Sequence, residues 1–171
     1  AGVIVGDIKT GYQSIESGEV DCLQILYNLI YQETEELIQE SWKKELGVII
    51  RSPLNSGFLS GAYNYGQTFD QNDARSEFFS GPEFDKRLDS LRKVQEELNV
   101  TNEELLEFAL KFILSNPHVS VVIPGPSKAT QVNRCIKIGE SSNLFDGKEF
   151  QQVKKLVIAN FGNQNMVIQN S

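Results

Sequence analysis

Short runs of β-branched residues alternate with helical segments along nearly the whole chain, and this alternation restricts the fold more than any other feature. We expect strands near residues 3–5, 22–27, 48–51 and 119–123. The third run is apolar almost without interruption, which is typical of a strand covered on both faces. Strands interleaved with helices in this way favour an α/β architecture with a parallel sheet and outer helices.

Helical patterns fill the gaps between these runs. From Phe84 to Leu98 the apolar residues recur at intervals of four and three, which predicts an amphipathic helix. Thr101 and Glu104 have the spacing of a capping box, and the helix after them is apolar on nearly all sides, so it should be buried. Further helices are expected at residues 9–16, 33–46, 131–136 and 147–161. In the second of these, the apolar stripe is expected to consist of Ile38, Trp42 and Leu46.

The composition is that of an ordinary globular protein of 171 residues, with 40% hydrophobic and 23% charged residues. We expect one domain over residues 1–161 and a polar tail at 162–171. A net charge of -7 disfavours nucleic acid and anionic membranes as partners, and no apolar run approaches the roughly 20 residues of a membrane helix. The chain begins at Ala1 on a strand-like run without a Met, as a fragment or processed product would.

Cysteine and histidine are scarce. Cys22 and Cys135 cannot build a disulfide framework, and their apolar surroundings favour a reducing cytoplasm. One histidine and two cysteines also cannot supply a zinc-type site, so no metal is expected. His118 precedes the fourth strand and should lie at the amino end of the sheet, where a structural role is expected.

Periodicity does not distinguish an open doubly wound sheet from part of a barrel. No Gly-x-Gly-x-x-Gly motif follows any expected strand, which removes the usual cofactor loop of the open sheet. A complete eight-stranded barrel takes about 250 residues. If the chain is part of such a barrel, it is short by roughly half a barrel.

Three segments carry a resemblance to a known family. Residues 19–29, which include Gln24 and the pair Tyr27 and Asn28, resemble the sixth-strand block of the aldo-keto reductases. Residues 47–61 resemble the seventh strand with its loop, and residues 121–132 the eighth strand with its phosphate loop. The blocks occur in order at fitting distances, and the resemblance extends from about Gly2 to Phe161. It implies a partial TIM-type (β/α) barrel made of the last four of eight strands.

The resemblance also implies a cofactor, NADP, and residues that contact it. Gln24 matches the side chain that hydrogen-bonds the nicotinamide carboxamide, although a buried structural amide is the alternative. Arg51 stands where the family stacks a side chain on the nicotinamide ring, or it is a strand-end salt-bridge partner. Four residues match the loop that wraps the pyrophosphate, and the small ones among them let backbone N–H groups approach an anion, or merely form a turn. These residues are Ser52, Leu54, Ser56 and Gly57.

A second loop matches the family's site for the adenosine 2′-phosphate. A strand, a Gly turn and a helix N-terminus form an anion site, and Lys128 adds a positive charge unless it is an ordinary surface lysine. The matching residues are Gly125, Ser127, Lys128 and Gln131. At four positions the chain departs from the family. Cys135 and Arg134 replace an adenine-contacting Asn and an acidic residue, and Ile4 and Val5 replace the Ser and Asn that hold the carboxamide.

The family's Asp, Tyr, Lys and His tetrad belongs to the first half of the barrel, and none of its motifs occurs in this sequence. We therefore expect the cofactor-binding half of a reductase that converts small carbonyl substrates to alcohols. No residue of this chain is expected to be catalytic, and the chain alone should bind NADP weakly or not at all. The alternative is a non-catalytic binding or scaffold domain that self-associates, as a homo-oligomer, through its open sheet edges.

Overall fold

A computed structural model describes residues 1–162 of the chain. The predicted polar tail, apart from Gly162, lies outside the described residues. The strands are β1 (Gly2–Ile4), β2 (Cys22–Leu26), β3 (Gly47–Arg51) and β4 (Val121–Val122). The helices are α1 (Ile8–Ser17), α2 (Glu35–Lys43), a 3-10 helix η1 (Asn55–Ser60), α3 (Arg75–Phe78), α4 (Gly81–Leu98), α5 (Asn102–Leu114), α6 (Ala129–Gly139) and α7 (Gly147–Phe161).

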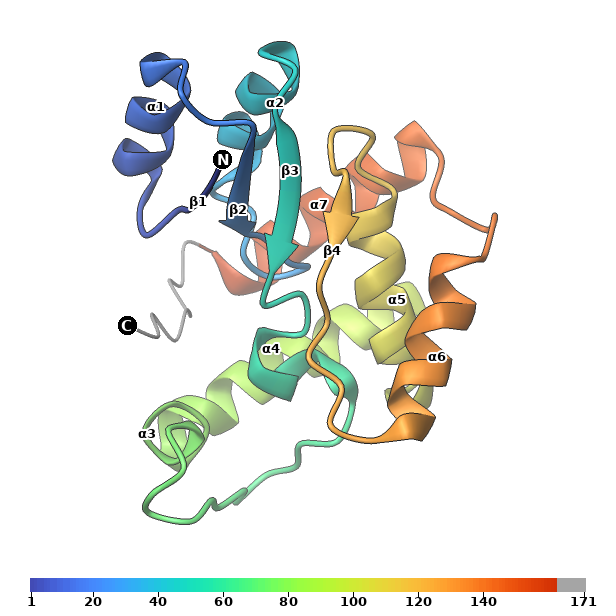
Figure 1. The fold of residues 1–171 in the computed structure, drawn as a ribbon. Helices are drawn as coiled ribbons and strands as arrows, with labels where there is room; N and C mark the ends of the chain where they lie inside the picture. The colour runs from blue at the N-terminus through green and yellow to red at the C-terminus, as the bar shows by residue number, and fades with distance from the viewer. Residues whose placement is uncertain (163–171) are drawn as a thin grey trace.

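The four strands form one parallel sheet in the order β1-β2-β3-β4 (Figure 1). This confirms the prediction of a sequential parallel sheet. Neighbouring strands are in register so that Ile4, Gln24, Ile49 and Val121 form one row across the sheet. The sheet is not closed, because β1 and β4 lie at its two ends.

The two faces of the sheet differ sharply in burial. Leu23 and Ile25 of β2, with Val48 and Ile50 of β3, are fully buried in the main core. Side chains alternate between faces along a strand, so residues such as Gln24 and Ile49 point the other way and are only half-buried. The helices therefore cover one face, and α7 lies behind the strands in Figure 1. The opposite face corresponds to the interior of a barrel and is open.

The buried character of α5 is confirmed. Leu105, Ala109, Phe112 and Ile113 are at most 1% exposed, and the capping box of Thr101 and Glu104 is present at its start. No helix among the described residues has both the length and the apolar character needed to cross a membrane.

The predicted stripe on the second helix is wrong at Trp42. The helix α2 ends at Lys43, so Leu46 lies beyond it, and the buried face consists of Leu37, Ile38 and Ser41. Trp42 is instead 55% exposed and packs its ring 4.8 Å from the ring of His118. This contact lies beside the amino end of β4, where a structural role was expected for the histidine.

The long segment after β3 contains two short helices and an aromatic cluster. Besides η1 and α3, it is held by an aromatic cluster with ring centroids 5.5 to 6.1 Å apart. The cluster consists of Phe58, Tyr63, Phe79 and Phe84. Phe79 and Tyr63 both belong to the main core and anchor the segment there.

Two glycines test how closely this segment packs on α5. Gly61 and Gly66 both have positive φ, +79° and +68°, which costs an L-residue roughly 1 kcal/mol. A Cβ on Gly61 would meet the Asn102 carbonyl oxygen at 1.9 Å, whereas one on Gly66 would meet nothing within 4 Å. We expect Gly66→Ala to lower the free energy of unfolding by about 1 kcal/mol and Gly61→Ala by about 3 kcal/mol or more. Urea unfolding followed by circular dichroism measures both, and equal losses would contradict this packing.

Candidate cofactor-binding cleft

A cleft of about 530 Å3 opens at the carboxyl ends of β3 and β4. The segments that leave these adjacent strands form its two walls. Eight of the ten residues that the sequence singled out line it, although they come from parts of the chain about 70 residues apart. These are Arg51, Ser52, Leu54, Ser56, Gly57, Gly125, Ser127 and Gln131.

The wall that follows β3 has an unusual backbone. Ser52, Asn55 and Ser56 have φ values of +51°, +45° and +54°, which non-glycine residues rarely adopt, and Gly57 follows with +92°. Asn28 Nδ2 donates to the Ser52 carbonyl oxygen at 3.1 Å, and Tyr63 Oη donates to the Ser56 carbonyl oxygen at 2.6 Å. Such strained backbone persists only where its surroundings hold it, and it concentrates at ligand sites.

The wall that follows β4 gathers donors at the start of α6. Gln131 Oε1 accepts hydrogen bonds from the Ser127 N–H at 2.8 Å, the Lys128 N–H at 3.1 Å and Ser127 Oγ at 3.2 Å. Three donors therefore converge on a single oxygen at a helix N-terminus, which is an arrangement that also suits a phosphate oxygen. Lys128 itself is exposed and stands next to this cluster, outside the lining of the cleft.

The charge of the cleft is opposite to that of the chain. Arg51 and Arg75 line it, and no Asp or Glu is among its lining residues, although the net charge of the chain is -7. Arg75 was not singled out in the sequence, because the long segment that carries it shows no periodic pattern. Its guanidinium pairs with Asp73 at 2.6 Å and lies 4.7 Å from the centre of the Phe69 ring. Hydrogen bonds from Arg75 lower the pKa of Asp73 to about 2, so this pair stays charged at neutral pH.

Arg51 bridges two strands. Its Nη2 donates to the Val5 carbonyl oxygen beyond β1 at 3.3 Å, and its buried Nε has no hydrogen-bond partner. The buried unpaired N–H leaves a donor for a ligand or water.

A family model described as the aldo/keto reductase family matches residues 12–158. The chain belongs to this family. It is 34% identical to "Aldo-keto reductase str7" of Strobilurus tenacellus, over 66% of this chain and 34% of that protein. It is 31% identical to a "Putative voltage-gated potassium channel subunit beta" of Schizosaccharomyces pombe, over 67% of this chain and 39% of that one.

A solved structure gives the same fold. The holo form of the aldo-keto reductase AKR11C1 from Bacillus halodurans superimposes with a TM-score of 0.69 and 20% identity, over 91% of this chain and 49% of that one. The chain thus spans half or less of the length of these relatives. Its four parallel strands and helices are part of the TIM-type barrel of the aldo-keto reductases.

Gln24 lies apart from the cleft of this reductase fold. It occupies the middle of the open face, in register between Ile4 and Ile49, and is half-buried. The structure therefore places Gln24 on the barrel-interior side, as expected, but not among the residues that line the cleft.

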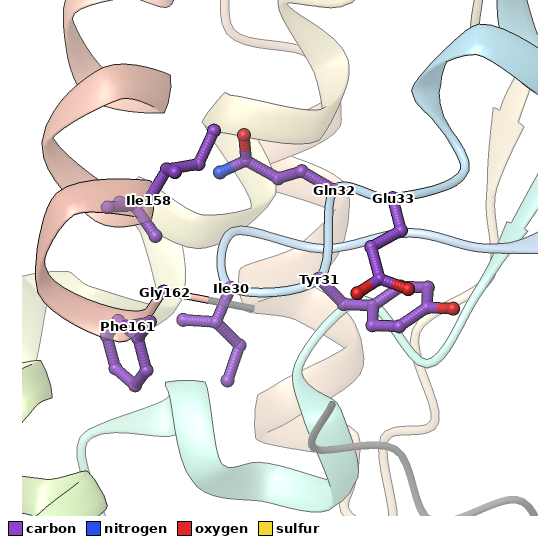
Figure 2. A pocket seen from close by; sticks show the side chains of 8 residues that line it. Ile30, Tyr31, Gln32, Glu33, Ile158, Phe161 and Gly162 are labelled. Carbon is purple, nitrogen blue, oxygen red and sulfur yellow. The ribbon is translucent and has the colours of Figure 1, made fainter. Parts of the chain in front are cut away.

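A smaller pocket of about 180 Å3 lies between the loop after β2 and the end of α7 (Figure 2), and the sequence gave no signal for it. Its walls include the apolar residues Ile30, Ile158 and Phe161. Gln32 lines it as well, donating to the Leu29 carbonyl oxygen at 2.7 Å, while its own buried Oε1 has no partner. This pocket therefore offers one unpaired hydrogen-bond acceptor, and no Lys or Arg is among its lining residues.

The hydrogen bond of Tyr63 allows a test of how the strained wall is held. Burial raises the pKa of Tyr63, so the hydroxyl remains a donor to Ser56 at neutral pH. We expect Tyr63→Phe to lower the free energy of unfolding by about 1 kcal/mol, because a part-buried carbonyl loses its partner. The control is Tyr65→Phe, which removes an exposed hydrogen bond to Asp89 and should cost less than about 0.5 kcal/mol. A smaller loss for Tyr63→Phe than for the control would contradict this role.

Proposed function

We propose that this chain is the C-terminal, cofactor-binding half of an NADP-dependent aldo-keto reductase that reduces small carbonyl compounds to alcohols. The observation that carries the proposal is the cleft, in which eight residues chosen from the sequence meet on a surface lined by two arginines and no carboxylate. A dinucleotide with a pyrophosphate and a 2′-phosphate is the anionic ligand that such a surface suits. Family membership supports the same reading.

Each wall has a distinct task in this proposal. The strained segment with Ser52, Ser56 and Gly57 surrounds the pyrophosphate, and Arg75 adds a guanidinium beside it. Ser127, Lys128 and Gln131 receive the adenosine 2′-phosphate, which would replace Gln131 Oε1 as the acceptor for the loop N–H groups.

At the nicotinamide end, Arg51 and Gln24 orient the ring and its carboxamide. When bound, NADPH supplies a hydride for the carbonyl carbon. No residue of this chain is assigned to protonate the carbonyl oxygen, because the family's tetrad motifs are absent from it. Its two cysteines, both free in the structure, agree with a cytoplasmic setting. The proposal includes neither a nucleic-acid nor a membrane partner.

The second candidate is a binding or scaffold domain of the same fold without chemistry. The large exposed side chains on the open sheet, Ile4 at 68% and Val121 at 49%, favour it. The two candidates separate on the cofactor, since a scaffold has no reason to recognise the 2′-phosphate.

Titration of the 15N-labelled chain with NADPH and with NADH tests the cofactor assignment even if binding is weak. We expect amide shifts concentrated at residues 51–57 and 125–131, with Gln24 and Arg75 also affected, and larger shifts with NADPH than with NADH. Lys128→Ala should weaken NADPH binding roughly fivefold, as expected for about 1 kcal/mol from one exposed charged contact, and leave NADH unchanged. Arg75→Ala should weaken both cofactors alike, because both contain the pyrophosphate.

The control is Lys148→Ala, another exposed lysine in the first turn of a helix. It should leave both titrations unchanged. Shifts centred on the pocket of Figure 2 would argue against the cofactor assignment.

The chain alone should not reduce an aldehyde. The physical reason is the missing proton donor, together with Ile4 and Val5 at positions where the carboxamide needs hydrogen bonds. The measurement is NADPH oxidation with a simple aldehyde, compared with a buffer blank. Turnover above the blank that tracks the purified chain would overturn the assignment of the catalytic residues to another part of the barrel.

A further inference from the structure

One buried amide connects two loops that leave neighbouring strands. Asn28 follows β2 and is fully buried, and it lies outside the lining of the cleft. Its Nδ2 donates to the Ser52 carbonyl oxygen at 3.1 Å, on the wall that follows β3. Its Oδ1 accepts from the Ile30 N–H at 3.1 Å and from the Tyr31 N–H at 2.9 Å, in the loop that follows β2. The two ends of the amide thus serve two different loops.

The loop that follows β2 is closed by hydrogen bonds of its own. Asn28 and Tyr31 exchange backbone hydrogen bonds of 3.0 and 3.2 Å, which form a turn. Further along, the buried Thr34 Oγ1 donates to the Leu26 carbonyl oxygen at 2.6 Å and ties the loop back to β2. None of these bonds involves the wall that follows β3. The loop is therefore a support that is ordered independently of the cleft.

The wall that follows β3 needs such a support, because its backbone is strained. Ser52 and Ser56 have φ values of +51° and +54°, and residues remain in this left-handed region only where neighbours hold them. The Ser52 carbonyl oxygen accepts from the Asn55 N–H at 3.0 Å within the turn and from Asn28 outside it. Tyr63 is the outside donor at Ser56. The strained wall is thus held from outside near both of its ends.

We propose that Asn28 is a positioning residue for cofactor binding. It lies behind the wall and fixes the Ser52 carbonyl group, and with it the course of the wall relative to β2. An amide offers a donor and an acceptor on one planar group, and both are used here. The inference rests on the proposed function, because it takes the pyrophosphate as the ligand of this wall.

The variant Asn28→Asp separates the two tasks of the amide. An aspartate has the shape of an asparagine, and its oxygens can still accept from the N–H groups of Ile30 and Tyr31. As a carboxylate it has no proton to donate, so an oxygen faces the Ser52 carbonyl oxygen in place of an N–H. As a carboxylic acid it regains a donor, and the hydrogen bonds of the wild type return. The wall should therefore be held at low pH and released at high pH.

The introduced carboxyl is the group whose titration matters in this test. Burial raises its pKa above the ordinary aspartate value of about 3.9, so it ionises between about pH 5.5 and about pH 8. Arg51, which precedes Ser52, remains a guanidinium throughout. Burial, together with the nearby Glu33, raises the pKa of Tyr31, so this phenol stays neutral. Glu33 and the cofactor's 2′-phosphate are common to variant and wild type, so comparison at the same pH cancels their titration.

The first measurement needs no cofactor. In 15N-labelled protein the amides of residues 53–57 report the backbone of the wall. We expect these amides to differ between Asn28→Asp and the wild type at about pH 8 and to approach the wild type at about pH 5.5. Circular dichroism at both pH values checks that the variant is folded.

The second measurement is the dissociation constant for NADP+, which is stable at both pH values. For Asn28→Asp we expect it to rise about tenfold over the wild type at high pH and about twofold or less at low pH, because the lost and regained group is one hydrogen-bond donor. NAD+ should lose affinity by the same factor, since the pyrophosphate is common to both cofactors.

The matched control is Asn116→Asp, which also places a carboxyl at a buried asparagine. Asn116 is 3% exposed, and its Oδ1 accepts from the His118 N–H at 3.0 Å, at the amino end of the sheet. This variant is expected to unfold more easily, because it buries a new acidic group. Its wall amides and its dissociation constants should nevertheless match those of the wild type at both pH values.

A wild-type dissociation constant for Asn28→Asp at high pH would overturn the proposal, and so would an equal loss of affinity in Asn116→Asp. Wall amides of Asn28→Asp that do not respond to pH would also contradict it, since the lost donor would then not control the wall. A wild-type chain that binds neither NADP+ nor NAD+ would instead refute the cofactor assignment. The wall amides would then decide by themselves whether Asn28 holds Ser52 in place.

Discussion

The parallel pairing of β2 with β3 is the constraint on which the rest of the structure depends. These are the longest strands, paired over five residues each, and Leu23, Ile25, Val48 and Ile50 anchor them in the core. Because both strands are fixed on the helical side, their carboxyl ends are fixed too. The backbone beyond β3 is tied to this frame by Asn28, which follows β2 and binds the Ser52 carbonyl oxygen. The loops that leave these strands are therefore held in fixed positions and can form a binding site.

At the carboxyl ends of these strands the backbone is locally strained, and two arginine side chains lie close by. Three non-glycine residues with positive φ follow within six residues of Arg51, held by Asn28 and Tyr63 from outside the turn. Two arginines and no carboxylate line the cleft, although Asp73 pairs with Arg75 beside it. The opposite wall offers three donors that Gln131 occupies. Rigid backbone donors and separated cations are what an extended, multiply charged anion requires.

The open face of the sheet and the position of the cleft both follow from the fact that four strands make half of a barrel. The helices satisfy the outer face of the sheet, but the inner face needs an opposing set of strands. Its apolar residues are covered towards the centre and exposed at the edges. The same half-barrel therefore contains both walls of the cleft but only half of a barrel interior.

The sequence by itself determined the kinds of element, their order and the loops that matter. Periodicity located every strand, and the spacing from Phe84 to Leu98 and the capping box at Thr101 located two helices, because these signals depend on contacts within a few residues. The family blocks identified eight residues that meet in the cleft. Only the tertiary structure decided that Arg75 and Tyr63 belong to the cleft, that Trp42 is exposed and that Gln24 lies apart. Those outcomes depend on which distant segments pack together, and no local pattern records such contacts.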